Sequence, residues 1–491
     1  MIRTTPDPDP VRARRRKALA LAALAVLVPA VALVVLHRRA ERPVASPPPP
    51  ADAGAGAVAS ATASAVPRCV QGRTAALWIG EASPRPPAPV RPAGAPAGAE
   101  MGREGEPPDR DEALAPFAAE LGRGACYDGG FAVGVKHQVE GGALAEVALM
   151  GLDGAGGRLV SLGRIRGDLG APLVVAAKGR VVAAMLEPNA GGFALRLASV
   201  SADKVAWGAE IDQERDDSLG FDFAIGAERG VVVWDGVTKD GTRAQVMLAA
   251  IEPRTLAVAE RPRPVSPPGL EAEAPRVVAG EGGFWLGYVV RAPSKKRPTR
   301  PAEPAGEAPD GRYPAESIEP AWVELMPLGA DGLPRAASRA VTPRDGHVQD
   351  FDLAPSEQGA ALLAWRDDDT PSGAHGGRLS LVRIEAGGPA QSQVMADDAA
   401  HAGAPSLLGG WLTTSAADGR LLLAALGPGG EALDELAPDP VLGEGELLAA
   451  GPSSLLLARP AGRGFELAVV SCRRPAGPGG GDTADAGGRP R

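Results

Sequence analysis

The sequence predicts an all-β fold built from one short unit that recurs about seven times after residue 120. Short runs of β-branched and aliphatic residues with alternating polarity fill this part of the chain, and such runs are typical of strands rather than helices. Asp-Gly, Gly-Gly and Pro-Gly pairs separate the runs and supply the positive φ angles that tight turns require. The runs return at a nearly constant spacing, which is the signature of a repeat architecture.

The clearest unit covers residues 348–388. It contains a strand, a turn at 356–359, a second strand that ends near Trp365, a polar loop and a third strand at 378–384. A fourth, more polar strand follows the third in some units, as at 158–165 and 204–211. The second strands of the seven units share one equivalent position. The residues at this position are Val135, Met185, Trp234, Trp285, Trp365, Trp411 and Leu457.

The spacing of these seven positions supports the repeat. Neighbouring positions lie 46 to 51 residues apart, except for a step of 80 between Trp285 and Trp365. That step contains a polar, Pro-rich insertion at 291–320, whose removal restores a spacing of 50. Because residues as different as valine, methionine and tryptophan share the position, we expect Trp365 to pack in the core. The first of these units is expected to begin at Cys126.

Four antiparallel strands every 40–50 residues resemble the blade of a β-propeller. We therefore predict a seven-bladed β-propeller over residues 69–474, with six or eight blades as alternatives. The seventh unit shows only three strands, and the run at 74–79 from the other end of the chain is available as its fourth. This arrangement resembles the Velcro closure of the propeller superfamily, in which both termini build one blade.

The three cysteines bear on this closure. Cys472 ends the third strand of the last unit and Cys69 precedes the run at 74–79, so the closure predicts a Cys69–Cys472 disulfide. A Cys69–Cys126 disulfide is the rival, and three reduced, buried thiols are the remaining alternative. An exported, oxidising compartment would allow such a disulfide.

The N-terminus predicts a membrane anchor. Residues 18–36 are apolar and uncharged, and basic stretches flank them on both sides. At about 1.5 Å of rise per residue this run just crosses a hydrocarbon core of about 30 Å. A cleaved signal peptide with Ala30 and Ala32 at its cleavage site is the alternative. The excess of Lys and Arg before the run places the N-terminus in the cytoplasm and the body outside the membrane.

These features divide the chain. We expect a basic cytoplasmic tail at 1–17, a transmembrane helix at 18–36 and a disordered Pro/Ala-rich linker at 37–68. The propeller at 69–474 carries disordered insertions at 83–112 and 291–320, and a disordered tail covers 475–491. Such a chain is expected at the cell membrane, with its body in the periplasm or at the cell surface.

The charge distribution argues against nucleic acid as a partner. Residues 1–42 hold nine Lys/Arg and three acidic residues, a net charge of +6, whereas the whole chain carries −9. The remainder therefore carries −15 and offers no basic surface to phosphates.

Motifs that carry chemistry are missing. The repeats lack WD40, Kelch, Asp-box and quinoprotein signatures, and no histidine or cysteine has a metal-ligand spacing. We therefore predict no catalytic residue, no metal and no cofactor.

Four aspartates are candidate ligand-binding residues. Asp222 and Asp352 occupy the same place in the first strands of two units, and first strands line the channel of a propeller. Two such aspartates would bind a cation or a basic group; alternatively, they face water while their phenylalanine neighbours pack. Asp235 and Asp367 follow second strands, where a charged loop is otherwise a solvated face.

The predicted function is binding or scaffolding at the cell envelope, with a protein or glycan partner on one rim. The alternative is a hydrolase or lyase that uses channel carboxylates, because propellers host many unrelated functions.

Overall fold

The computed structural model describes residues 69–71, 77–79 and 119–473, the last range with internal gaps of which the longest are 213–219, 293–319, 369–376 and 397–402. The predicted basic tail, linker, first insertion and C-terminal tail lie outside these residues, as does most of the second insertion. Among the described residues, no helix is long and apolar enough to cross a membrane. The helix expected at 18–36 lies outside them and stays a prediction.

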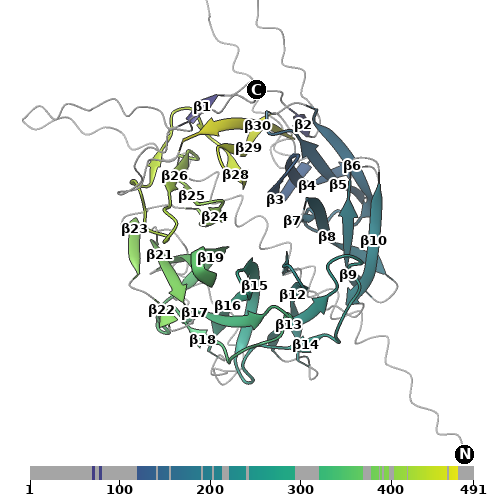
Figure 1. Ribbon diagram of the computed structural model, residues 1–491, viewed down its shortest axis with the longest axis vertical. Helices are drawn as coiled ribbons and strands as arrows, with labels where there is room; N and C mark the ends of the chain where they lie inside the picture. The colour runs from purple at the N-terminus through teal and green to yellow at the C-terminus, as the bar shows by residue number, and fades with distance from the viewer. Residues whose placement is uncertain are drawn as a thin grey trace, which may run out of the picture. The chain divides into compact units, whose positions relative to one another are not determined.

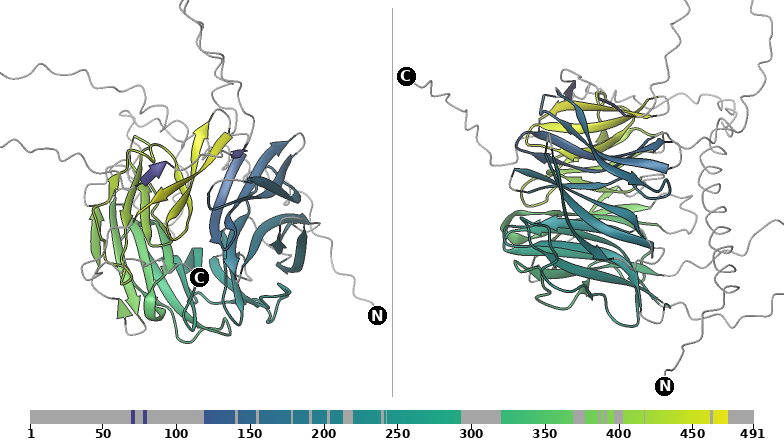
Figure 2. Two further views of the ribbon diagram at one scale, coloured as in Figure 1. Left: turned by 45° about the horizontal axis from the view of Figure 1, so that its top comes forward. Right: turned by 90° about the vertical axis from the view of Figure 1, so that its right-hand side faces the viewer.

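The described chain forms seven antiparallel sheets that follow one another around a ring (Figure 1). This confirms the seven-bladed β-propeller. The seven innermost strands contact one another in sequence, and the innermost strand of the last blade contacts that of the first. In the side views of Figure 2 the first blade (blue) and the seventh (yellow) are neighbours, although their residues are far apart in sequence.

The strand bounds are as follows. Blade one contains β3 (Ala119–Tyr127), β4 (Gly130–Val139), β5 (Gly142–Met150) and β6 (Arg158–Ile165). Blade two contains β7 (Leu173–Ala177), β8 (Arg180–Asn189), β9 (Gly192–Val200) and β10 (Val205–Asp212). Blade three contains β11 (Phe221–Ile225), β12 (Gly230–Val237), β13 (Ala244–Ile251) and β14 (Arg263–Pro264). Blade four contains β15 (Glu271–Gly280), β16 (Gly283–Arg291), β17 (Ala321–Gly329) and β18 (Arg339–Ala340).

Blade five contains β19 (Val348–Pro355), β20 (Ala361–Asp367), β21 (Arg378–Glu385), β22 (Gly388–Pro389) and β23 (Gln393–Ala396), with a short 3-10 helix, η1 (Glu357–Gly359), between β19 and β20. Blade six contains β24 (Ser406–Leu408), β25 (Trp411–Ser415), β26 (Leu421–Ala425) and β27 (Ala437–Pro438). Blade seven contains β28 (Glu446–Ala450), β29 (Ser454–Ala461) and β30 (Gly464–Cys472), and two strands from the other end of the chain, β1 (Cys69–Gln71) and β2 (Leu77–Ile79), which both pair with β30.

The hydrophobic core lies between neighbouring blades. Each cluster of buried apolar side chains draws on the facing sheets of adjacent blades, including one cluster that joins blade seven to blade one. Trp234 and Trp411 are each 1% exposed, and Trp365 is 5% exposed at the predicted packing position. A four-stranded sheet has two apolar faces, and the ring buries both of them against its neighbours.

The closure of the ring confirms the predicted disulfide. Cys69 of β1 lies opposite Cys472 of β30 in the strand register, and the two sulfurs are bonded across a Cα–Cα distance of 4.1 Å. The rival Cys69–Cys126 pairing is therefore wrong, and Cys126 is a free thiol. Of the strand expected at 74–79, the described part is β2 (Leu77–Ile79), and Cys69 lies in a further short strand, β1, that was not predicted.

The first blade begins earlier than the sequence suggested. Its inner strand starts at Ala119 rather than at Cys126. The sequence there, LGRGA, shows neither alternation nor β-branched residues. Gly122 is required because a Cβ atom at this position would lie 2.0 Å from the carbonyl oxygen of Pro172, in the approach to blade two. The close packing of two blades therefore requires a small residue here, and the strand lacks the side-chain pattern by which a strand is recognised from sequence.

Candidate functional site

Arg123 enters the central channel from an irregularity in the innermost strand of blade one. The register of β3 against β4 shifts between Leu121 and Gly124, where three steps along β3 oppose two along β4. Such a β-bulge turns side chains away from the regular alternation. Arg123 lies inside the bulge, and 32% of its side chain is exposed.

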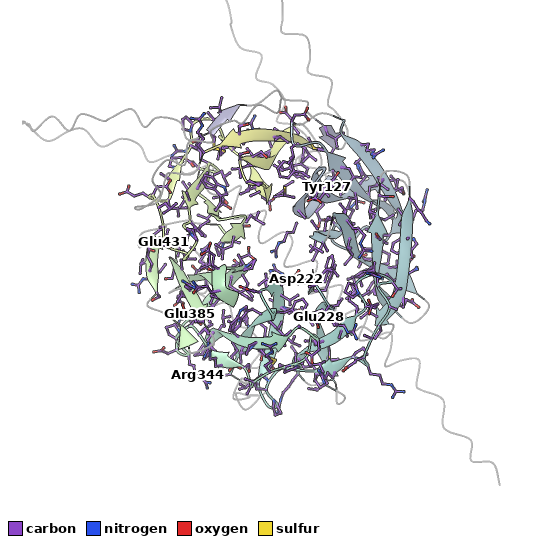
Figure 3. The ribbon with its side chains drawn as sticks, in the orientation of Figure 1. Tyr127, Asp222, Glu228, Arg344, Glu385 and Glu431 are labelled. Atoms are coloured by element: carbon purple, nitrogen blue, oxygen red, sulfur yellow. A yellow bond between two sulfur atoms is a disulfide. The ribbon has the colours of Figure 1, made fainter. Side chains whose placement is uncertain are left out.

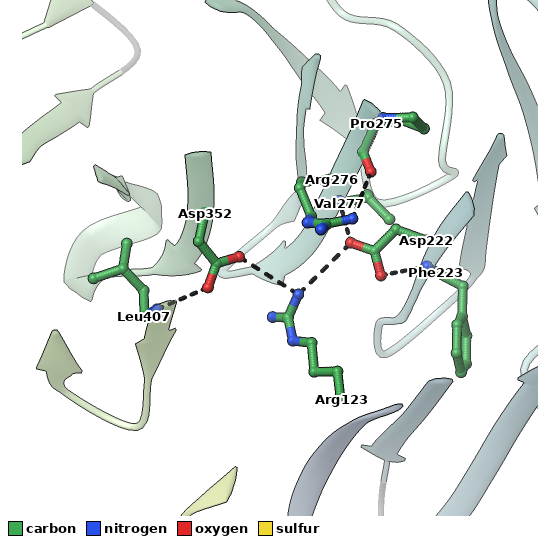
Figure 4. Close-up of polar contacts among 8 residues, drawn as sticks. All are labelled: Arg123, Asp222, Phe223, Pro275, Arg276, Val277, Asp352 and Leu407. Atoms are coloured by element: carbon green, nitrogen blue, oxygen red, sulfur yellow. Dashed lines mark hydrogen bonds and ion pairs between the residues drawn. The ribbon is translucent and has the colours of Figure 1, made fainter. Parts of the chain in front are cut away.

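The guanidinium of Arg123 lies between the two predicted channel aspartates (Figure 4). Its Nη1 atom is 3.8 Å from Oδ2 of Asp222 and 3.6 Å from Oδ1 of Asp352. The three residues belong to β3, β11 and β19, the inner strands of blades one, three and five. Asp222 lies near the centre of the ring, whereas Arg344 and Glu431 lie at its periphery (Figure 3).

Both aspartates are buried and hydrogen-bonded to the backbone. Asp222 is 3% exposed and Asp352 is 6% exposed. Oδ2 of Asp222 accepts a hydrogen bond of 2.9 Å from the backbone N–H of Val277, and its Oδ1 accepts one of 2.9 Å from Phe223. Oδ2 of Asp352 accepts a hydrogen bond of 2.7 Å from the backbone N–H of Leu407. Each aspartate thus joins its own blade to the next one.

Burial and the opposite charges of the arginine and the two aspartates together determine the pKa values of this cluster. Burial raises the pKa of Asp222, and the guanidinium groups of Arg123 and Arg276 and two backbone amides only partly offset it. For Arg123, burial lowers the pKa, but the carboxylates of Asp352 and Asp222 outweigh it, so the pKa is raised. The guanidinium therefore stays charged and holds two carboxylates that otherwise repel each other.

A cavity of about 360 Å³ opens beside this group, between blades five, six and seven. We call it the channel mouth. Its charged lining residues are Arg123, Arg276, Asp350, Asp352 and Glu446. Its remaining lining residues include hydroxyl side chains and apolar side chains, namely Ser406, Thr413, Thr414, Ser415, Phe351, Pro405, Leu408, Leu421, Leu447 and Leu448.

The channel mouth lies where the inner strands are irregular. Besides β3, the register shifts in β15 between Glu273 and Arg276, and in β19 between Val348 and Asp350. It also shifts in β28 between Leu447 and Ala449. In β15 the irregularity includes Ala274, a non-glycine residue with φ of 53°. Bulges are frequent beside functional sites because they re-aim side chains, and here they deliver Arg123, Arg276 and Asp350 to one cavity.

Two acidic residues of the channel mouth have shifted pKa values. Burial raises the pKa of Glu446. Burial also raises the pKa of Asp350, where Arg366 and Arg276 act in the opposite direction and Asp368 acts in the same one. Shifted carboxyl groups in a cavity are candidates for functional groups.

A second cavity, of about 540 Å³, lies on the other side of Arg123. It is lined by Arg123, by the ends of the inner strands of blades five and six, and by the turns that follow them, including Glu357 and Gly409. We call it the opposite cavity. Glu357 is the acidic residue among its lining residues within the described chain.

The other two predicted residues lie away from both cavities. Asp367 ends β20, and its Oδ1 accepts a hydrogen bond of 2.6 Å from the backbone N–H of His347. Asp235 lies in β12, is 9% exposed, and its backbone N–H donates to the carbonyl oxygen of Gly220. In the described part of the chain, neither residue lines the channel mouth or the opposite cavity. The structure therefore brings together Asp222 and Asp352 but not Asp235 and Asp367.

The sequence reading missed Arg123, Arg276, Asp350 and Glu446. Asp350 carried a usable signal, because it lies two residues before Asp352 and strand residues two apart share a face. Arg123 carried none, since its strand was not recognised. In the described ranges, no group of three or more His, Cys, Asp or Glu residues is placed to hold a metal ion.

Comparison with known proteins finds structural similarity at low sequence identity. No protein-family model matches this chain, and no curated protein matches its sequence. Among solved structures, the β-propeller domain of the Trilobed protease from Pyrococcus furiosus, which has an open Velcro topology, is similar at a TM-score of 0.43 and 10% identity, over 72% of this chain and 94% of that one. A polysaccharide lyase is similar at a TM-score of 0.44 and 10% identity, over 81% of this chain and 97% of that one.

A third similar structure is the acylaminoacyl peptidase of Pyrococcus horikoshii, with a TM-score of 0.41 and 12% identity. The match covers 71% of this chain and 51% of the peptidase, so the chain spans about half the length of that enzyme. We base the fold on the strand pairing of this chain, and the functional proposal on its own residues.

Proposed function

We propose that the protein is a binding module of the cell envelope that engages a protein or glycan partner at the channel mouth. The observation that carries this proposal is the convergence of irregular inner strands on one charged cavity. The bulges in β3, β15 and β19 are not needed to pack the blades, because regular strands would bury the same faces. Irregular backbone that delivers Arg123, Arg276 and Asp350 to one place supports a role in recognition.

The contacts of Asp222 and Asp352 favour binding over catalysis by these two residues. A general acid or base needs an oxygen that is free to exchange a proton with a substrate. Both oxygens of Asp222 accept backbone hydrogen bonds, and Asp352 is shared between Leu407 and Arg123. These two carboxylates are therefore engaged in holding the blades together.

A hydrolase or lyase acting at the same cavity is a second candidate. The observation that favours it is that two carboxyl groups with raised pKa values, Asp350 and Glu446, line one cavity, because shifted carboxyl groups in a cavity are candidates for acid–base catalysis. Purified protein that released products from peptide or polysaccharide substrates, and lost this turnover in Glu446→Gln while still binding them, would support this candidate over a pure binding module.

We also propose that residues 18–36 anchor the body outside the membrane. The Cys69–Cys472 disulfide supports an exported body, because disulfides persist in oxidising compartments. Reporter fusions placed after residue 60 test the orientation. A reporter that is active only outside the cytoplasm should give signal, and activity of a cytoplasm-only reporter would refute the proposed topology.

The binding role is tested by site-specific cross-linking on the full chain in its own cells. A photoreactive amino acid at Ser406 reports on the channel mouth, and one at Ser356 reports on the opposite cavity as the matched control. We expect a discrete cross-linked species from Ser406 that is absent from Ser356. Equal labelling from both positions, or none from either, would contradict a partner at the channel mouth.

A further inference from the structure

We propose that the channel mouth receives a lysine or arginine side chain of a protein partner, with its charged end between Asp350 and Glu446. This inference rests on the proposed binding function and adds the chemistry of the group that is bound. It follows from the balance of charge in the cavity, from the contacts that its carboxylates lack, and from the character of its walls.

The charges around the cavity do not balance. Arg123 and Arg276 supply two guanidinium groups to the lining, whereas Asp350, Asp352 and Glu446 supply three carboxyl groups, and Asp222, which contacts Arg123, adds a fourth beside the cavity. Arg123 is already shared by Asp222 and Asp352. Two arginines just outside the lining already have partners: Arg366 donates from its Nε atom to Oδ1 of Asp368 at 2.7 Å, and Arg459, beside Gly445, donates from Nη2 to the carbonyl oxygen of Val441 at 2.9 Å. The cavity therefore has room for a further positive charge.

Asp350 and Glu446 are the carboxylates that lack a direct partner. Within the described chain, neither has a basic side chain at salt-bridge distance. Both line the cavity as exposed residues, so a cation that enters it can reach their carboxyl groups. A cation bound between them would lower their pKa values and stabilise their charged forms.

A threonine hydroxyl adds a neutral acceptor. Thr413 lines the channel mouth and is 2% exposed. Its side chain makes no hydrogen bond to any described residue, unlike that of its neighbour Thr414, which donates to the carbonyl oxygen of Gly403 at 2.8 Å. An ammonium or guanidinium group can donate to this oxygen.

The apolar part of the wall fits the stem of a long basic side chain. Pro405, Leu408, Leu447 and Leu448 line the same cavity as the charged groups. Lysine and arginine pack their methylene stems on apolar surface while their charged ends stay with polar partners. The aromatic lining residue among the described residues, Phe351, is 7% exposed and so presents no open ring face to a sugar. The walls therefore favour a peptide side chain over a glycan.

The test uses the purified full chain and two fluorescent peptides of alternating Gly, Ser and Lys, identical except that every lysine of the second is Nε-acetylated. Fluorescence anisotropy at physiological salt measures both affinities. We expect the lysine peptide to bind at least about tenfold more tightly, in line with the strength of hydrogen bonds to charged groups. Glu446→Gln and Asp350→Asn should each reduce this affinity about tenfold.

Glu357→Gln is the matched control, because it removes one carboxylate from the opposite cavity and leaves the channel mouth unchanged. We expect it to bind like the wild type. Equal affinity for the acetylated peptide, or an equal loss in Glu357→Gln, would overturn the inference. Thermal unfolding of each variant separates a loss of binding from a loss of folding.

Different outcomes of the cross-linking and peptide-binding experiments contradict the basic side chain and the binding role. If cross-linking from Ser406 still identifies a partner but the lysine peptide does not bind, the basic side chain is wrong and the binding role stands. Binding of a neutral oligosaccharide that is lost in Glu446→Gln would have the same meaning. If Ser406 captures no partner and neither peptide binds, both proposals are wrong.

Discussion

Asp222 and Asp352 accept hydrogen bonds from backbone amides that lie the same distance ahead in the chain, 55 residues in each case. The donors, Val277 and Leu407, belong to the inner strands of the following blades. The two aspartates thus make equivalent contacts in blades three and five, and both face Arg123 of blade one (Figure 4). One arginine therefore organises hydrogen bonds that join several blades at the centre of the ring.

Arg123→Met should destabilise the fold strongly. It keeps a side chain of similar length but leaves two buried carboxylates without their shared cation. We expect a loss of about 3 kcal/mol in the free energy of unfolding, near the lower end of the cost of breaking a buried ion pair, because the site is partly exposed. Urea denaturation measures this loss.

Arg420→Met is the control for Arg123→Met. Arg420 pairs with Asp418 at the surface, where the two side chains are 54% and 51% exposed. An exposed pair of this kind contributes less than about 1 kcal/mol. Similar losses in the two variants would contradict the central role of Arg123.

Asp222→Asn should cost more stability than Asp352→Asn. Both changes remove a charge that faces Arg123, but both oxygens of Asp222 accept backbone hydrogen bonds, whereas only Oδ2 of Asp352 does so. An asparagine at position 222 must turn its amide NH₂ toward one backbone N–H, which leaves that donor without an acceptor. We expect a difference of about 1–3 kcal/mol in the free energy of unfolding.

The same urea denaturation series checks this difference between the two asparagine variants. A double variant, Asp222→Asn with Asp352→Asn, serves as the reference for coupling through Arg123. Equal costs for the two single variants would show that the hydrogen bond from Phe223 to Asp222 contributes little.

The repeat made the fold predictable from sequence, and the same logic located Asp222 and Asp352. Seven aligned second strands set the number of blades, and the three-stranded last unit pointed to β30 as the strand that needs a partner from the N-terminal end. The Cys69–Cys472 disulfide followed from that closure. Where the blades repeat the same pattern, comparing the units of one chain with each other identifies equivalent positions, as an alignment of related sequences otherwise would.

The channel mouth was not predictable because it lies where the repeat breaks. An extra residue in a strand reverses which side chains face the channel, and nothing in the run LGRGA marks such a bulge at Arg123. The same holds for Arg276, which follows the irregular segment at Ala274. Glu446 begins its strand, where alternation carries no information. Only the packing of neighbouring blades decides where these side chains point.

Glu446→Gln should raise the melting temperature at neutral pH. Burial raises the pKa of Glu446 in the folded protein above its unfolded value, so the folded state binds more protons. The wild type therefore loses stability as pH rises from the unfolded pKa through the raised folded one. A glutamine does not ionise, so its advantage should be small in acid, grow through this window and then stay constant.

Thermal unfolding of both proteins between about pH 2 and pH 8, a range that begins below the unfolded pKa values of aspartate and glutamate, measures this effect. Asp418→Asn gives a control of opposite sign, because hydrogen bonds from the backbone and side chain of Arg420 lower the pKa of Asp418. Its carboxylate contributes stability at neutral pH that is lost as pH falls through the lowered folded pKa. A pH-independent advantage of Glu446→Gln would contradict burial as the cause.

The Cys69–Cys472 disulfide should contribute much of the stability of the ring. It joins residues 403 apart in sequence, across the strand pair that closes blade seven. Removing a native disulfide costs about 2–5 kcal/mol in many small domains, partly because the unfolded chain gains freedom. The double variant Cys69→Ser with Cys472→Ser should lose a similar amount in urea denaturation, whereas Cys126→Ser should lose much less. Thiol labelling of the denatured, non-reduced wild type should find one free cysteine, and three would show that the ring closes without the bond.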